Sequence, residues 1–349
     1  MRVVNAPSLL GQIFEEEPDL PSHIESIELL AREHGDVYRV RAGGAAFIAH
    51  VSVRGTQYLQ RLRENLGRVS ALNDKRIPRV AAWSQSESGK AWAVLVCPEI
   101  PGDELNRTNA TVPALESLAD LLFRLHSVDA PVERHDGVTY TLDDPAGFTA
   151  FSETLLSRLV DLPIARDRVR RHLGEMASYL EANAKAFVVS ARLIHGDLHR
   201  SNIVVSGSEI GLLDWGDLAG GDYAYDLASL KFVLDSVIPR SSVEFIRNRA
   251  RHYRDQFQDA TIEVRLRYFL SLAGLVRAIH CANDTAAFGP GRAWRVRACY
   301  LHSEVQWRKP LRLDGQEMGA PPVKTEDWAL DMRQPLRGLY YLVAPRRVS

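Results

Sequence analysis

Residues 195–217 have the sequence HGDLHRSNIVVSGSEIGLLDWGD, in which polar segments flank two short apolar runs. The runs Ile203–Ser206 and Ile210–Leu213 lie on either side of a Ser-Gly-Ser turn and predict a small β-hairpin. The surrounding sequence is mainly helical in pattern. We therefore expect the chemistry of this protein at the ends of this isolated hairpin.

Three side chains at the ends of the hairpin suit phosphate chemistry. Asn202 precedes the hairpin and Asp214 follows it, and amide and carboxylate oxygens are ligands that suit Mg²⁺, which takes its other ligands from water and phosphate. Asp197, five residues before Asn202, is then left to accept a proton from an attacking hydroxyl. Phosphoryl transfer requires a metal that neutralises the phosphates and a carboxylate that orients the nucleophile.

Three ordered motifs resemble those of the aminoglycoside phosphotransferase and choline kinase group, small-molecule kinases with a protein-kinase-like fold. They are HGDLHRSNI at residues 195–203, LLDWGD at 212–217 and GGDYAYDLASL at 220–230. Solvated carboxylates on an unrelated fold are the alternative interpretation. Three motifs in this order within a short segment favour the family.

The resemblance implies a role for each matching residue. Asp197 matches the catalytic base, and Asn202 and Asp214 match the two Mg²⁺ ligands of the family. Asp226 matches a position that braces the catalytic loop through backbone hydrogen bonds. The implied fold is α+β, a bilobal protein-kinase-like fold with a small antiparallel-sheet N-terminal lobe and a larger, mainly helical C-terminal lobe.

The first hundred residues have the pattern of a small sheet with one helix. Short β-branched runs surround a Gly-Gly turn and predict a hairpin, a helical stretch follows, and two more apolar runs predict further strands. The predicted elements are strands at 37–41 and 46–53, a helix at 56–72, and strands at 80–83 and 91–97.

Beyond Pro98-Glu99-Ile100-Pro101-Gly102 the chain becomes helical. Apolar residues recur at helical spacing in five stretches, at 115–125, 150–160, 169–187, 243–257 and 264–283.

The domain boundaries follow from this change of pattern. We expect a nucleotide-binding lobe at residues 1–98, a hinge at 99–106 and a catalytic and substrate-binding lobe at 107–349. The segment LVCPEIPGDEL, residues 95–105, resembles the hinge of the family, where backbone atoms hold the nucleotide base. In that register the Pro98 carbonyl accepts a hydrogen bond and the Ile100 N–H donates one. An ordinary interdomain linker is the alternative, since Pro and Gly breaks are common.

One position departs from the family pattern. The family has Lys or Arg on the third strand, held by a helix glutamate, and the alignment places His50 there with Glu64 as the natural partner. A neighbouring Glu64 would favour a protonated imidazole that binds phosphate. Arg54, on the same strand face, is the alternative cation. A His50 without a role would leave a degenerate kinase that binds nucleotide without turnover.

The composition limits the class of protein. The chain has 349 residues, with 43 Lys and Arg against 44 Asp and Glu, so its net charge of −1 gives no overall attraction to nucleic acid or anionic lipid. No targeting signal or membrane-spanning run is visible. Three scattered cysteines fit free thiols in a reducing cytosol. We expect a cytoplasmic protein without nucleic-acid or membrane partners, while the sequence indicates no oligomeric state.

The expected activity is transfer of the γ-phosphate of ATP or GTP, with Mg²⁺, to a hydroxyl of a small molecule. The resemblance implies an antibiotic or related natural product as acceptor. Two alternatives are a catalytically degenerate nucleotide-binding regulator or scaffold, and a protein kinase, which HGD in place of HRD disfavours. The arginines of the later helices favour a neutral or anionic acceptor over a polycation: Arg247, Arg249, Arg251, Arg254, Arg265, Arg267 and Arg277.

Overall fold

A computed structural model describes residues 5–32, 35–53, 56–86, 91–132, 145–158, 166–288, 293–308 and 311–314. The chain forms two compact units, each described below by itself. The first contains residues 1–105, 111–125 and 200–218, and the second contains residues 106–110, 126–199 and those from 219 onward. Arg54 and the chain beyond residue 314 lie outside the described residues. The functions assigned above to the two lobes stay predictions.

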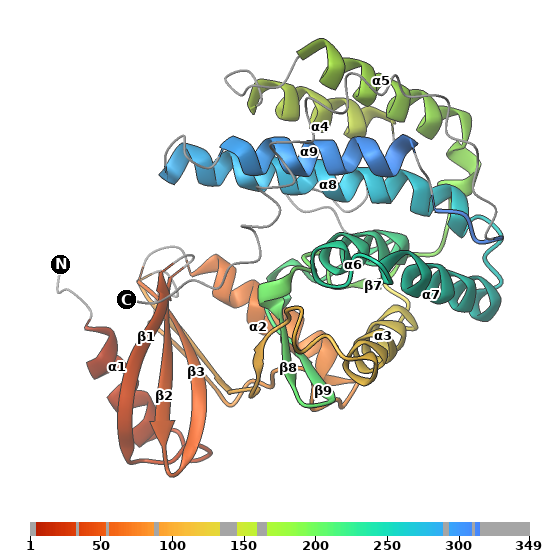
Figure 1. Cartoon of the computed structure of the whole chain (residues 1–349). Helices are drawn as coiled ribbons and strands as arrows, with labels where there is room; N and C mark the ends of the chain where they lie inside the picture. The colour runs from red at the N-terminus through yellow and green to blue at the C-terminus, as the bar shows by residue number, and fades with distance from the viewer. Residues whose placement is uncertain are drawn as a thin grey trace. The chain divides into compact units, whose positions relative to one another are not determined.

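The first unit is built on a five-stranded antiparallel sheet with the order β1-β2-β3-β5-β4 (Figure 1). The predicted hairpin is confirmed: Gly43 and Gly44 connect β2 to β3 with φ angles of 56° and 75°, a conformation that glycine adopts without strain. The strands are β1 (Ile24–Arg32), β2 (Asp36–Ala42), β3 (Ala45–Ser52), β4 (Ala82–Gln85) and β5 (Ala93–Pro98).

Helix α1 (Ala6–Glu16) covers part of this sheet and closes its core. The ring of Phe14 packs edge-on against Phe47 of β3, with centroids 5.5 Å apart. Neither α1 nor β1 was predicted from the sequence. All nine β1 residues are exposed or half-buried, and the sequence of this edge strand lacks the alternation that identifies a strand.

Two helices and a smaller sheet complete the first unit. Helix α2 (Gln57–Ser70) confirms the predicted helix, and α3 (Val112–His126) carries the leucine stripe found in the sequence. The small sheet has the order β6-β8-β9, with β6 (Asp103–Glu104), β8 (Ile203–Ser206) and β9 (Glu209–Leu212). The predicted hairpin between Asn202 and Asp214 is therefore confirmed.

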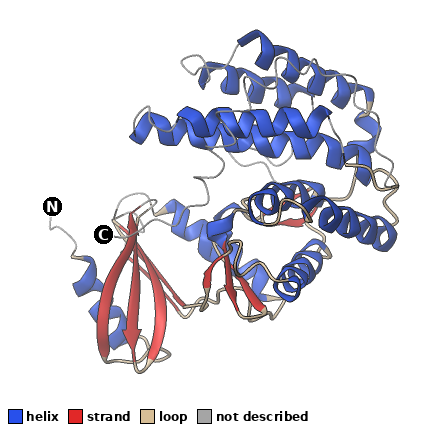
Figure 2. Ribbon diagram, viewed as in Figure 1, coloured by secondary structure: helices blue, strands red, loops and turns tan. Residues whose placement is uncertain are grey.

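The second unit is mainly helical, as Figure 2 shows. Helices α8 and α9 lie side by side, α4 and α5 pack beside them, and α6 packs on α8 (Figure 1). Strands β7 (Arg192–Ile194) and β10 (Ala219–Gly221) form an antiparallel pair. Together with the first unit, this confirms the α+β fold class. The helices are α4 (Pro145–Arg158), α5 (Arg166–Ala182), α6 (Tyr223–Val237), α7 (Ser242–Phe257), α8 (Ile262–Phe288) and α9 (Ala293–Arg308).

Helices α6 and α9 were not predicted. Helix α6 is buried on nearly every side, so its sequence has no polar face to reveal a helical period. Within the described part of the chain, no helix is long and apolar enough to cross a membrane.

A buried arginine of the second unit forms ion pairs with two aspartates. Arg265 of α8 is fully buried, and its Nε donates to Asp222 Oδ2 at 2.5 Å while Nη2 donates to Asp259 Oδ2 at 2.6 Å. Burial alone would raise the pKa of Asp259. The hydrogen bonds from Arg265 and Tyr223 outweigh that effect and hold the pKa of Asp259 well below its usual range.

Replacing Arg265 by Met should therefore leave two carboxylates without their partner. We expect R265M to lower the free energy of unfolding by about 3–5 kcal/mol, the cost typical of breaking a buried ion pair. Urea denaturation at pH 7 measures this change. R254M, which removes an exposed arginine of α7, is the matched control and should change stability by less than about 0.5 kcal/mol.

The ion pair between Arg265 and Asp259 also predicts that the stability of the protein falls at acid pH. A carboxyl with a depressed folded pKa stabilises the protein above its unfolded pKa and loses that contribution as the pH falls. Wild type should thus lose stability below about pH 4, the unfolded value of Asp, and R265M should lose less over the same range. Parallel pH profiles of the two proteins would contradict this assignment.

Candidate active site

The loop after β7 carries the predicted catalytic base and is held by one buried carboxylate. Asp226 in the first turn of α6 accepts backbone N–H bonds from His195 at 2.7 Å and from Gly196 at 3.0 Å. Its Oδ2 also lies 2.9 Å from Nε2 of His126, at the end of α3. Burial would raise the pKa of Asp226, but these hydrogen bonds keep it below its usual value. The predicted bracing role of Asp226 is confirmed by these contacts.

Asp197 follows this fixed turn and is 23% exposed. His199 Nε2 lies 3.3 Å from its Oδ2, and Arg277 Nη2 of α8 lies 3.4 Å from its Oδ1. Burial would raise the pKa of Asp197, but the hydrogen bond with His199 and the charge of Arg277 outweigh it and hold the pKa well below its usual range. Asp197 is therefore ionised at neutral pH and able to accept a proton.

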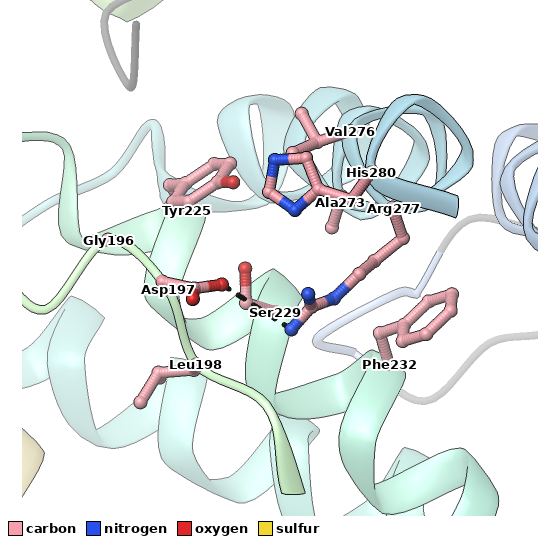
Figure 3. Close-up of a pocket in the computed structure, with 10 residues that line it drawn as sticks. All are labelled: Gly196, Asp197, Leu198, Tyr225, Ser229, Phe232, Ala273, Val276, Arg277 and His280. Carbon is pink, nitrogen blue, oxygen red and sulfur yellow. Dashed lines mark ion pairs between the residues drawn. The ribbon is translucent and has the colours of Figure 1, made fainter. Parts of the chain in front are cut away.

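A pocket lies beside Asp197 within the second unit (Figure 3). The loop contributes Asp197 and its two neighbours, and one face each of α6 and α8 supplies the other walls. Figure 3 shows the Asp197 carboxylate and the Arg277 guanidinium pointing toward each other in this pocket. The helical walls are formed by Tyr225, Ser229 and Phe232 of α6 and by Ala273, Val276, Arg277 and His280 of α8.

The two predicted metal ligands lie at one end of the β8–β9 hairpin in the first unit. Ile203 pairs with Leu212, and one step further the Leu213 N–H donates to the Asn202 carbonyl at 2.8 Å. This pairing brings Asn202 and Asp214 to the same end of the hairpin. One amide oxygen and one carboxylate fit Mg²⁺ that takes its other ligands from phosphate and water. Among the described residues, no cluster of three or more His, Cys, Asp or Glu side chains could hold a metal.

Asp214 has an unusual backbone conformation. Its φ angle is 55°, in the left-handed region that is uncommon for residues with a side chain and often found at functional positions. Tyr58 of α2 donates to Asp214 Oδ1 at 2.7 Å. A Cβ atom on Gly216 would come within 2.7 Å of the Tyr58 ring, so glycine at this position allows Tyr58 to reach Asp214.

Helix α2 contacts this segment through an asparagine. Asn65 Nδ2 donates to the carbonyls of Trp215 at 2.8 Å and Gly216 at 3.2 Å, and Asn65 is buried. Its neighbour Glu64 is exposed. Tyr58 and Asn65 were missed by the sequence reasoning. Asn65 is a polar residue within the apolar stripe of α2, and that pattern was the available signal.

His50 lies in the middle of β3, paired with Val37 and Leu95. Burial lowers the pKa of His50, and the charge of Asp214 raises it only in part. The imidazole is therefore neutral at pH 7. The carboxylate that acts on it is Asp214, whereas the sequence had suggested Glu64.

The two residues predicted to bind the nucleotide base, Pro98 and Ile100, lie at the end of β5 and just after it. Pro98 is the last residue of β5, paired with Phe47, and Ile100 follows two residues later with its side chain against Gly211 of β9. The assignment of the Pro98 carbonyl and the Ile100 N–H to a nucleotide base stays a prediction, as do the roles of His50 and Glu64.

Solved structures with the same fold are numerous. A thermostable mutant of aminoglycoside phosphotransferase APH(4)-Ia, in a ternary complex with AMP-PNP and hygromycin B, is 14% identical with a TM-score of 0.60, over 86% of this chain and 98% of that one. The GDP complex of wild-type aminoglycoside 2'-phosphotransferase-IIIa is 16% identical with a TM-score of 0.59, over 86% and 99% of the two chains. Plasmodium vivax ethanolamine kinase is 13% identical with a TM-score of 0.54, over 80% and 81%.

These likenesses show a protein-kinase-like fold, as the motifs had implied. No curated protein matches this chain in sequence. The sequence model of the phosphotransferase enzyme family, however, matches residues 26–263, which is most of the chain and includes all three motifs. This chain thus belongs to the phosphotransferase enzyme family.

Proposed function

We propose that this protein transfers the γ-phosphate of ATP or GTP to a hydroxyl group of a small molecule. The observation that carries the proposal is the Asp197 carboxylate, which is ionised, partly exposed and set on a loop fixed by Asp226. Such a carboxylate can accept the hydrogen bond of an acceptor hydroxyl and take its proton during transfer. The family membership and the nucleotide complexes of similar folds support the same activity.

Asn202 and Asp214 would hold Mg²⁺ at the end of the β8–β9 hairpin. When bound, Mg²⁺ neutralises charge on the phosphates. Tyr58 fixes the orientation of the Asp214 carboxylate, and Asn65 fixes the backbone that follows it. By the resemblance, Pro98 and Ile100 bind the nucleotide base, and His50 and Glu64 occupy the places of the phosphate-binding pair.

An antibiotic or a related natural product is the acceptor class that the similar structures suggest, since two of them are named as aminoglycoside phosphotransferases. A nucleotide-binding protein without turnover is the second candidate. The observation that favours it is the neutral, half-buried His50, which the alignment places where the family has a cation. The variants below distinguish the two.

The variant D197N should abolish transfer and keep nucleotide binding. Removal of a general base typically costs about 10²–10⁴-fold in rate, whereas Asp197 makes no contribution to nucleotide binding in this proposal. Release of ADP or GDP is measured with a panel of hydroxylated natural products and also without acceptor. The affinity for AMP-PNP serves as the control, and wild-type turnover by D197N would show that Asp197 is not the base.

The variant D214N should weaken Mg²⁺-dependent nucleotide binding. We expect the affinity for AMP-PNP in the presence of Mg²⁺ to fall at least about tenfold, a loss seen even for residues that only orient a metal ligand. Binding without Mg²⁺ should change little. E209Q, which removes an exposed charge from the same hairpin, is the matched control. An unchanged Mg²⁺ dependence in D214N would remove Asp214 from the metal site.

The variant H50K tests the departure from the family pattern. A lysine at position 50 adds a charged donor, and we expect about tenfold tighter binding of Mg²⁺–AMP-PNP. H50Q keeps a neutral side chain and should bind like wild type, because His50 is neutral here. Weaker binding by H50Q would show instead that His50 is charged in the complex.

A further inference from the structure

The pocket beside Asp197 contains Arg277, whose guanidinium has a hydrogen-bond donor that is not satisfied by any described residue. Arg277 Nη2 lies 3.4 Å from Asp197 Oδ1, longer than the 2.7–2.9 Å of a charge-assisted hydrogen bond. The same Nη2 atom is buried and makes no hydrogen bond within the described part of the chain. A buried donor without an acceptor is destabilising. An oxygen from a ligand in this pocket would therefore be stabilised at Arg277.

The charges that line the pocket do not suit a polycation. Asp197 is the only acid among the ten lining residues, and Arg277 already offsets its charge. His280, on the same face of α8, adds no negative charge. The other side chains are neutral or apolar. An acceptor with several ammonium groups would find no surplus of negative charge here, and it would face Arg277 directly.

The pocket next to Asp197 has about 280 Å³ of empty space, part of it open to solvent. A hydroxyl can therefore lie at Asp197 while the rest of the acceptor extends toward solvent. The Arg277 side chain is 23% exposed although its Nη2 is buried, so a group next to that hydroxyl can approach the guanidinium from its solvent-facing side.

We propose that the acceptor carries an anionic group, such as a carboxylate, next to the hydroxyl that is phosphorylated, and that Arg277 binds this group. The inference rests on the proposed function, because it assigns the acceptor class of that same site. A guanidinium binds a carboxylate through two parallel N–H···O bonds and so fixes its orientation. With Arg277 engaged in this way, the neighbouring hydroxyl is placed at the Asp197 carboxylate.

The transferred phosphate is a second possible anion for Arg277, and the experiment separates the two sources. D-glucuronate, D-glucose and D-glucosamine share one hydroxylated ring and carry a carboxylate, a neutral group and an amine, respectively. Their binding to the full chain is measured by ligand-observed NMR titration in the presence of Mg²⁺ and AMP-PNP. Because AMP-PNP is not turned over, the titration reports binding alone.

Glucuronate should bind wild type at least about tenfold more tightly than glucosamine, with glucose between them. R277Q should remove this difference, and R277K should keep part of it, since lysine retains the charge without the planar fork. R254Q removes an exposed arginine elsewhere in the second unit and should leave the order unchanged. Thermal melting of each variant checks that it is folded.

The proposal is overturned if glucosamine or glucose binds as tightly as glucuronate, if none of the three sugars binds, or if the preference survives in R277Q. A loss of AMP-PNP affinity in R277Q would assign Arg277 to the nucleotide phosphate instead and would equally overturn it. The proposed function is judged separately by D214N. Mg²⁺-dependent AMP-PNP binding that D214N weakens, together with no preference for glucuronate, would retain the kinase and reject the anionic acceptor.

Discussion

The position of the loop that carries Asp197 depends on the Asp226 carboxylate, which accepts hydrogen bonds from the backbone N–H groups of His195 and Gly196. Asp226 is fully buried, so an unpaired charge there would be strongly destabilising. The loop backbone and His126 supply the hydrogen bonds that allow the charge to be buried. The stability of the helical unit and the position of Asp197 are therefore linked, because the loop cannot move without leaving a buried carboxylate unsatisfied.

The first unit holds Asp214 and the turn after it with neutral hydrogen-bond donors. Tyr58 donates to Asp214, and Asn65 donates to the carbonyls of Trp215 and Gly216. These bonds fix the left-handed turn at Asp214 without adding positive charge near the carboxylate. A neutral His50 is consistent with that arrangement, since burial lowers its pKa and the charge of Asp214 offsets that effect only in part.

The elements predicted best from the sequence are those whose pattern lies within a few neighbouring residues. The Gly43-Gly44 hairpin and the β8–β9 hairpin were found because turn residues separate alternating apolar runs. Helix α6 was missed because burial on nearly all sides removes the helical period, although its first turn contains a recognised motif. The motif therefore located Asp226 without revealing the helix that presents it.

The sequence predicted which residues form the candidate site, but it did not predict how they are arranged in space. Asp197, Asn202 and Asp214 were proposed from residue type and order, which a linear motif preserves, and their catalytic and metal-binding roles stay predictions. Tyr58, Asn65 and Arg277 come from helices far away in the sequence. Their roles depend on tertiary packing, which no local pattern specifies.

Arg277 also raises a question about catalysis, because a guanidinium next to Asp197 makes that carboxylate a weaker base. The difficulty is resolved by the nature of phosphoryl transfer, in which a loose transition state requires little proton removal before the phosphate is transferred. Under that condition the main task of Asp197 in the proposed reaction would be to orient the hydroxyl, and an ionised, weakly basic carboxylate orients it well. The proposed recognition of the acceptor by Arg277 would then cost the chemical step little, since positioning and electrostatics contribute more to phosphoryl transfer than strong basicity does.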